Sequence, residues 1–398
     1  MGGTFSSATS RTLTTTPPPS TPSPVRGVWV SPTGDDAAAG TTDAPLRTLH
    51  QAQQEARRLR SLQPGPVSVT LAPGRYELAR PLEFDAADGD AVWWGAAAAG
   101  QVRISGGALV GPWQREGSAD RVQLWRSPAL PDPAVPLWRA ALPAGATANQ
   151  LWVCGERAVR ARHPNGAGML RWERPLAAPF GAWGLVYEAG QGLEAMGQAL
   201  VGSEAVAFHS WTASRHTVAA HLPLQRTLLF AQPSHAALGA HLRQSGRRFY
   251  LEHSLAFLDA PGEWVRADNA TLLYAAAQAP DAAGCEVVAS RGLEALLHVS
   301  GAAEAPVRDL TLRNLTWEHT EWSMPPSPQP ADFQAAAWLP TAAVHVRYAE
   351  RVRLQGGGVE HTGGYALWFA EGTADCAVEG GHLSDLGAGG VRLGVAAP

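Results

Sequence analysis

DLTLRNLTWEHT, residues Asp309–Thr320, is the first of three copies of one short pattern near the end of the chain. The second copy is RVRLQGGGVEHT (Arg351–Thr362) and the third is DCAVEGGHLSDL (Asp375–Leu386). The second and third copies begin 24 residues apart, and the first and second begin 42 apart, which is one such period plus an 18-residue insertion. A period in the low twenties is typical of a solenoid in which each repeat forms one coil.

The aligned positions indicate what each coil is made of. Leu312, Leu354 and Val378 share one position, and apolar residues alternate with polar ones on both sides of it. Such alternation is typical of β-strands that bury one face. Leucine-rich repeats have a similar period, but their dense leucine frame is absent from these copies. The repeats therefore predict an all-β fold, a parallel β-helix.

The composition agrees with many short strands. Of 398 residues, 42 are Gly and 31 are Pro, and charged residues make up only 17%, so we expect a helix content well under a fifth. The net charge of −4 gives no basic surface for nucleic acid. There is no apolar run of 18 residues, so no membrane-spanning helix is predicted. We expect a monomer. The 15 Trp residues suit either sugar stacking or core packing.

The cysteines and the N-terminal segment give further expectations. Cys154, Cys285 and Cys376 are odd in number and far apart, so we interpret them as buried small apolar residues. Residues 1–26 are rich in Ser, Thr and Pro, contain no acidic residue and lack the apolar core of a secretory signal. They are expected to be a disordered tail, with a transit peptide as the alternative. The localisation stays open.

The rest of the chain divides into three parts. Residues 27–107 are expected to hold a cap and the first coils, 108–284 an inserted region of irregular β-structure, and 285–398 further coils. In the cap, a strand at 28–30 precedes a helix with Asp43 as N-cap and Pro45 in its first turn. The apolar stripe of this helix would cover the open first coil. The stripe consists of Leu46, Leu49, Ala52, Ala56 and Leu59.

Several longer motifs resemble one known family. They are WVSPTGDD and APLRTLHQAQ, then APGRYELARPL, CGERAVRARHPN, LEHSLAFLDAPGEW and DLGAGGVRLG. These motifs resemble the bacterial right-handed β-helix proteins of glycoside hydrolase family 141, which have the pectin-lyase-like fold. The resemblance extends over residues 27–394 and implies that the helix is right-handed.

The resemblance also implies an activity. Members of the family act on plant cell-wall glycans as α-L-fucosidases or xylanases. We therefore expect a glycoside hydrolase that binds an oligo- or polysaccharide and uses carboxylates without a cofactor, outside the cytoplasm. Family members continue through further coils after the position of Pro398. The chain is thus expected to be a truncated fragment whose second catalytic acid lies on missing coils.

The repeats also nominate catalytic residues. In register, Glu318 aligns with Glu360 and Ser384, and His319 aligns with His361 and Asp385. Coils are about 4.8 Å apart, so two solvent-facing glutamates would lie about 5 Å apart, as in a retaining glycosidase. The alternative is a row of solvated structural residues. Asp385 begins a Gly-rich turn, either as a catalytic acid of the cleft or as a side chain that caps the turn.

Substrate-binding candidates surround these acids. His319 and His361 are assigned to sugar hydroxyl groups or to structural hydrogen bonds, and they lack a third ligand for zinc. Asp35 and Asp36 belong to no acidic cluster that would bind calcium. The 18-residue insertion, 321–338, is interpreted as a wall of the cleft or as a self-packed surface loop. The remaining predicted sugar contacts are Trp322, Gln334, Trp338 and, in the next coil, Tyr365.

Two other functions stay open. A polysaccharide lyase needs a base beside a cation, for which Arg347, Arg351 or Arg353 are available. A non-catalytic carbohydrate-binding protein would stack sugars on Trp without turning them over.

Overall fold

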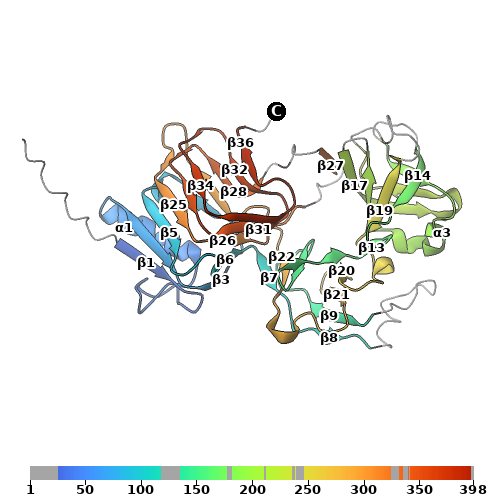
Figure 1. Ribbon diagram of the computed structural model, residues 1–398, viewed down its shortest axis with the longest axis horizontal. Coiled ribbons are helices and arrows are strands. Elements are labelled where there is room, and N and C mark those ends of the chain that lie inside the picture. The colour runs from blue at the N-terminus through green and yellow to red at the C-terminus, as the bar shows by residue number, and fades with distance from the viewer. Residues whose placement is uncertain are drawn as a thin grey trace, which may run out of the picture.

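The computed structural model describes residues 26–117, 135–176, 182–209, 212–234, 238, 246–323, 331–334, 339 and 341–395. The fold is all-β, as predicted, with α1 (Leu49–Leu62) and the single turn α3 (Leu193–Met196) as the α-helices of these ranges. Figure 1 shows two lobes, one built from both ends of the chain and the other from its middle. The predicted disordered tail lies outside the described residues, except Arg26, which begins β1.

The first lobe contains three sheets of parallel strands, which we call the first, second and third parallel sheets. The first holds β1 (Arg26–Val30), β2 (Val67–Leu71), β5 (Ala91–Gly95), β25 (Leu310–Arg313), β30 (Arg353–Gln355) and β34 (Ala377–Glu379). The second holds β3 (Gly74–Glu77), β6 (Val102–Ser105), β26 (Thr316–Glu318), β31 (Gly358–Thr362) and β35 (His382–Leu386). The third holds β4 (Leu82–Phe84), β23 (Leu297–Ser300), β28 (Ala342–Arg347), β32 (Tyr365–Phe369) and β36 (Val391–Leu393). A short additional sheet holds β24 (Val307–Arg308), β29 (Ala349–Glu350) and β33 (Thr373–Ala374).

The chain visits these sheets in a fixed order. It passes from the first to the second to the third, as in β2, β3 and β4, and each later circuit does the same. Leu312 pairs with Leu354 and Leu354 with Val378, so the alignment of the three sequence copies is the register of the first sheet. The predicted insertion also falls where expected. Residues 319–341 join β26 to β28, whereas only residues 363–364 join β31 to β32.

The interior between the parallel sheets is apolar. Alternate residues of each strand point inward, so that Ile104, Trp317 and Val359 follow one another on successive strands of the second sheet and are buried. Trp317 is only 2% exposed. Burial of this continuous apolar column stabilises the stack of strands, because each circuit alone would leave its inner face in water.

Helix α1 packs against β1 and β2 through the buried Leu49, Ala52 and Ala56. Its N-cap is Thr48, whose hydroxyl accepts a hydrogen bond from the Gln51 N–H at 3.2 Å. The predicted N-cap, Asp43, is therefore wrong.

Two contacts explain the later start of the helix. The carboxylate of Asp36 accepts the N–H groups of Arg47 and Thr48, which holds these residues outside the helix. Leu46 belongs to this entry segment, where it forms a β-bridge with Val30.

The second lobe consists largely of antiparallel sheets between β6 and β23. One sheet holds β7 (Gly107–Leu109), β10 (Leu151–Val153), β11 (Glu156–Arg157) and β22 (Val287–Ser290). Another holds β8 (Gln114–Arg115), β9 (Leu137–Ala141), β12 (Val159–Arg160), β20 (Glu263–Arg266) and β21 (Thr271–Ala275). The largest holds β13 (Arg162–His163), β14 (Leu170–Pro175), β15 (Gly184–Tyr187), β16 (Glu204–Phe208), β17 (Thr212–Leu222), β18 (Thr227–Phe230) and β19 (Arg248–Glu252). It also receives β27 (Ala331–Gln334) from the long connection after β26, which Figure 1 shows beside β17.

Cys154 and Cys285 form a disulfide with their Cα atoms 4.9 Å apart, so interpreting all three cysteines as unpaired apolar residues is wrong. The pairing of β10 with β22, with Val153 opposite Val287, brings together two cysteines separated by 131 residues. Their distance in sequence concealed this contact. Cys376 is free and half-buried. In the described part of the chain no helix is long and apolar enough to cross a membrane.

Replacing Trp317 with Ala is expected to lower the free energy of unfolding by about 3–5 kcal/mol, because the ring leaves a cavity inside the stack of parallel strands. Chemical denaturation of the variant and the wild type measures this difference. Leu62→Ala is the matched control, since Leu62 is 70% exposed and should change stability by less than about 0.5 kcal/mol. An equal loss in both variants would contradict the assigned register.

Candidate active site

The outer face of the second parallel sheet carries a polar column. Because its inward positions are apolar, the alternate positions carry polar side chains that follow one another in register across the five strands. We call this the carboxylate column. It consists of Glu77, Ser105, Glu318, Glu360 and Ser384.

A second column lies one residue further along the chain, where β26, β31 and β35 bend. His319, His361 and Asp385 have φ angles of 65°, 56° and 47°, so each adopts the left-handed conformation. The two imidazole rings stack with their centroids 5.2 Å apart, and His361 Nδ1 lies 2.8 Å from Asp385 Oδ2. The structure thus brings together the three residues that the repeat alignment placed in one column, which we call the His–Asp column.

Trp152 of β10 and Arg157 of β11 cover this column from the second lobe. Trp152 donates its indole N–H to Asp385 Oδ2 at 3.2 Å, and its ring lies edge-on to His319 with centroids 4.7 Å apart. Arg157 donates Nε–H to Asp385 Oδ1 at 2.9 Å and lies over the Trp152 ring. Sequence reasoning missed both residues. Arg157 belongs to the motif CGERAVRARHPN and Trp152 lies two residues before it, but they are 228 and 233 residues from Asp385, and nothing in the motif indicates this contact.

The Asp385 carboxylate is held in its ionised form. Partial burial acts to raise the pKa of Asp385, but the hydrogen bonds from His361, Arg157 and Trp152 outweigh burial and hold this pKa well below its usual range. Among the described residues no backbone N–H donates to this carboxylate, so the turn-capping alternative is wrong.

The glycines that follow Asp385 serve packing. A Cβ on Gly387 would come within 2.1 Å of the Gly363 carbonyl oxygen, and one on Gly389 within 2.5 Å of the Tyr365 ring. The Gly-rich turn therefore lets adjacent coils approach closely.

Glu318 is 1% exposed, so the expectation that both column glutamates face solvent is wrong for this residue. The second lobe covers the middle of the carboxylate column, where Ser105 and Glu318 are buried, whereas Glu77 at its start is exposed. Glu318 Oε1 lies 3.8 Å from Arg103 Nη1 and 3.4 Å from His319 Nδ1. Burial alone would raise the pKa of Glu318, but His319, Arg103 and Arg75 together lower it. Burial also lowers the pKa of His319, which favours the neutral ring.

Glu360 stays accessible, with 22% of its side chain exposed. His382 Nε2 lies 3.0 Å from Glu360 Oε2, and the Ser384 hydroxyl donates to the same oxygen at 3.4 Å. Gly358 makes room for this contact, because a Cβ there would meet the His382 ring at 2.3 Å. Glu360 and Asp385 are thus the two predicted acids that reach solvent beside each other on adjacent strands.

The other predicted sugar contacts are dispersed. Tyr365 is buried in the third parallel sheet beneath Arg392, whose guanidinium lies 5.6 Å from the ring centre. Gln334 belongs to β27 and pairs with Thr212 in the second lobe. Trp338 lies outside the described residues. Trp322 lines a cavity of about 290 Å³ that also includes Arg157.

That cavity adjoins Asp385, because Arg157 belongs to both. We call it the arginine cavity and define it by its polar and aromatic lining. These residues are Asn149, Gln150, Arg157, Arg160, Arg162, Glu204, Arg215, Glu252 and Trp322.

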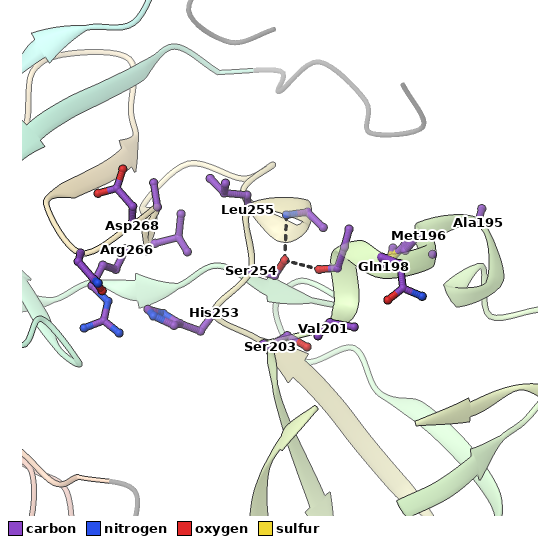
Figure 2. A pocket seen from close by; sticks show the side chains of 17 residues that line it. Ala195, Met196, Gln198, Val201, Ser203, His253, Ser254, Leu255, Arg266 and Asp268 are labelled. Atoms are coloured by element: carbon purple, nitrogen blue, oxygen red, sulfur yellow. Dashed lines mark hydrogen bonds between the residues drawn. The ribbon is translucent and has the colours of Figure 1, made fainter. Parts of the chain in front are cut away.

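A larger cavity of about 650 Å³ lies within the second lobe. Figure 2 shows Ser254 in its wall, hydrogen-bonded to the Ala199 carbonyl, with His253 and Arg266 nearby. Burial lowers the pKa of His253 to about 3, which keeps this ring neutral. None of the residues predicted from the repeats lines this cavity, so we place the candidate active site at Asp385. No group of three or more potential metal ligands occurs in the described ranges.

Comparison with known proteins supports the fold. No family model matches the chain, and no curated protein matches it significantly. The structure is similar to a solved glycoside hydrolase at TM-score 0.68 and 21% identity, over 90% of this chain and 65% of that one. A complex of XylC with xylose is similar at TM-score 0.40 and 12% identity, over 87% of this chain and 42% of that protein. The chain thus has a glycoside hydrolase-like fold and spans about two thirds of the first neighbour.

Asp385→Asn is expected to destabilise the folded chain by about 1–2 kcal/mol near neutral pH, since charge-assisted hydrogen bonds are lost at a partly exposed site. The pKa of Asp385 is lower in the folded state than its ordinary 3.8. The stabilisation is therefore fully present above about pH 4 and is lost as the pH falls below that value. Urea unfolding between pH 7 and pH 3 measures the difference between variant and wild type. The control is Glu379→Gln, because the Glu379 side chain is exposed on β34 of the first sheet. A stability difference between Asp385→Asn and wild type that does not shrink in acid would contradict the assignment of these hydrogen bonds to an ionised Asp385.

Proposed function

We propose that this chain is a glycoside hydrolase that acts on a cell-wall-type polysaccharide through carboxylate chemistry. The observation that carries the proposal is Asp385, an ionised carboxylate held by donors from both lobes beside the accessible Glu360. The glycoside hydrolase-like fold supports it. Within this proposal, the three parallel sheets are the faces of a right-handed parallel β-helix of the family 141 type.

The environments of the two acids suggest separate roles. Asp385 stays ionised, which suits a nucleophile at the anomeric carbon or a base that deprotonates the attacking water. Glu360 would protonate the leaving glycosidic oxygen as the bond to the anomeric carbon breaks. His361 positions Asp385 through its Nδ1 contact. Glu318 is covered, so its charge would act on the site through His319 without touching the sugar.

The division into parts is also a proposal. The cap and first coils end near Gly107, and the inserted region follows. The antiparallel pairing of β7 with β22 supports placing the return to coils after Ser290, slightly later than the sequence indicates.

A polysaccharide lyase is the second candidate, and Arg157 is the observation that favours it. A lyase needs a base beside a cation, and Arg157 lies 2.9 Å from Asp385. The three arginines named from the sequence serve less well, because Arg347, Arg351 and Arg353 each pair with a carboxylate away from the second parallel sheet. Their partners are Glu371, Asp309 and Glu379. A lyase product contains a new carbon–carbon double bond and absorbs in the ultraviolet, whereas hydrolysis releases a saturated reducing end.

The test is a screen of the full chain against aryl glycosides, beginning with the α-L-fucoside and the β-xyloside. Asp385→Asn and Glu360→Gln are each expected to lower kcat/KM by about 10²–10⁴-fold, the usual contribution of a positioned acid or base. Glu379→Gln should leave kcat/KM unchanged, because Glu379 pairs with Gln355 and Arg353 on the first sheet.

Three outcomes would contradict the proposal. They are activity that survives both site variants, a sugar product that contains a new carbon–carbon double bond, or sugar binding by a well-folded chain without turnover. The last result would identify the non-catalytic carbohydrate-binding protein.

A further inference from the structure

We propose that the arginine cavity beside Asp385 binds the carboxylate of an acidic sugar, so that the substrate is a glycan carrying uronic acid residues. This inference rests on the proposed function and deepens it by naming the substrate class. Four arginines line one cavity of about 290 Å³, and one of them shares Asp385 with the candidate active site.

Two of these arginines form a neutral, rigid floor with two glutamates. Arg160 donates to Glu204 and Glu252 at 2.7 Å each, and Arg215 donates to Glu204 at 2.6 Å and also to Glu252. All four side chains are less than one fifth exposed. Two cations and two anions cancel here, so this group fixes the shape of the cavity.

Arg162 is different, because no carboxylate pairs with its guanidinium among the described residues. Its Nε donates to the Pro164 carbonyl at 3.1 Å and its Nη2 to the Gly168 carbonyl at 3.4 Å. The guanidinium lies 4.0 Å from the centre of the Tyr250 ring, which orients it. The nearby Glu263 carboxylate accepts the backbone N–H of Arg162 on one oxygen and those of Asp259 and Ala260 on the other, so it is engaged with the backbone. Since Asp385 balances Arg157, the charge of Arg162 is left over.

A surplus guanidinium in a cavity calls for an anion. Arginine presents its N–H groups in a planar fork that matches a carboxylate, and Nη1 of Arg162 donates to no atom of the described residues. Neutral sugars are bound through hydroxyl groups and need no unbalanced cation. Elsewhere in the first lobe, arginines such as Arg308 and Arg351 pair with carboxylates of neighbouring strands, so the surplus at Arg162 is not the general pattern.

The size and walls of the cavity suit a single sugar unit. Its volume lies near the lower limit for ligand pockets. Trp322 offers an aromatic surface, and Asn149 and Gln150 line the same space. Their side-chain amides are held by Glu321 and Arg157. A uronic acid bound here would place the next glycosidic bond near Arg157 and Asp385.

The test compares each acidic glycan with its own carboxyl-reduced form. Oligosaccharides of glucuronoxylan and of polygalacturonate are titrated into the full chain by calorimetry, before and after reduction of their carboxylates to alcohols. We expect the wild type to bind at least one acidic form about tenfold or more tightly than the reduced form. Added salt should reduce this difference in affinity between the acidic and the reduced form, because salt screens the interaction between the carboxylate and the guanidinium.

Arg162→Gln should abolish that preference and leave the affinity for the reduced form unchanged, while Arg162→Lys should restore part of it. Arg248→Gln is the control, because Arg248 is exposed on β19 of the same lobe. Thermal unfolding of each variant checks that it is folded. In kinetics with the same acidic oligosaccharides, Arg162→Gln should show a higher KM and an almost unchanged kcat.

The outcomes separate the two claims. No preference for either acidic glycan, no binding of either, or an equal loss for both forms in Arg162→Gln overturns the inference. If the inference is overturned but turnover of neutral glycosides still depends on Asp385, the proposed hydrolase function is kept without the acidic substrate. An acidic preference that depends on Arg162 without turnover of any glycan supports the binding site and overturns the hydrolase.

Discussion

The hydrogen bonds to the Asp385 carboxylate are the interaction on which this account depends. His361 provides one from the same stack of strands, and Trp152 and Arg157 provide two from a lobe more than two hundred residues away in sequence. These donors dock the second lobe onto the parallel sheets and keep the carboxylate ionised. Under the proposed function, one side chain both attaches the two lobes and takes part in the chemistry.

That contact depends in turn on the register of the second parallel sheet. Side chains alternate between the apolar interior and the outer face, so a shift by one residue would turn the glutamates into the apolar interior and Trp317 to the outer face. The left-handed bend after each strand places His319, His361 and Asp385 in one column. The second lobe covers the middle of the carboxylate column and leaves its ends open, so Glu318 is buried while Glu77 and Glu360 reach solvent.

The sequence predicted the features that repeat. The alignment of three copies identified the all-β class, the register of paired strands, the position of the long insertion and the two columns, because stacking transmits a sequence period directly into space. It failed where contacts join unlike parts of the chain. No sequence repeat indicates the disulfide between Cys154 and Cys285. The same holds for the contacts of Trp152 and Arg157 with the His–Asp column. The N-cap is Thr48 and not the predicted Asp43, because the Asp36 carboxylate holds the residues that precede the helix. No capping motif in the sequence indicates this contact between segments.

The most direct test of the central claim is the pH dependence of kcat/KM in Arg157→Gln. If Arg157 keeps Asp385 ionised for catalysis, its loss raises the pKa of this carboxylate, and the acidic limb of the profile moves to higher pH. The account predicts this shift with the alkaline limb unchanged. An acidic limb that stays in place while activity falls uniformly would show that Asp385 only attaches the two lobes and takes no part in the chemistry.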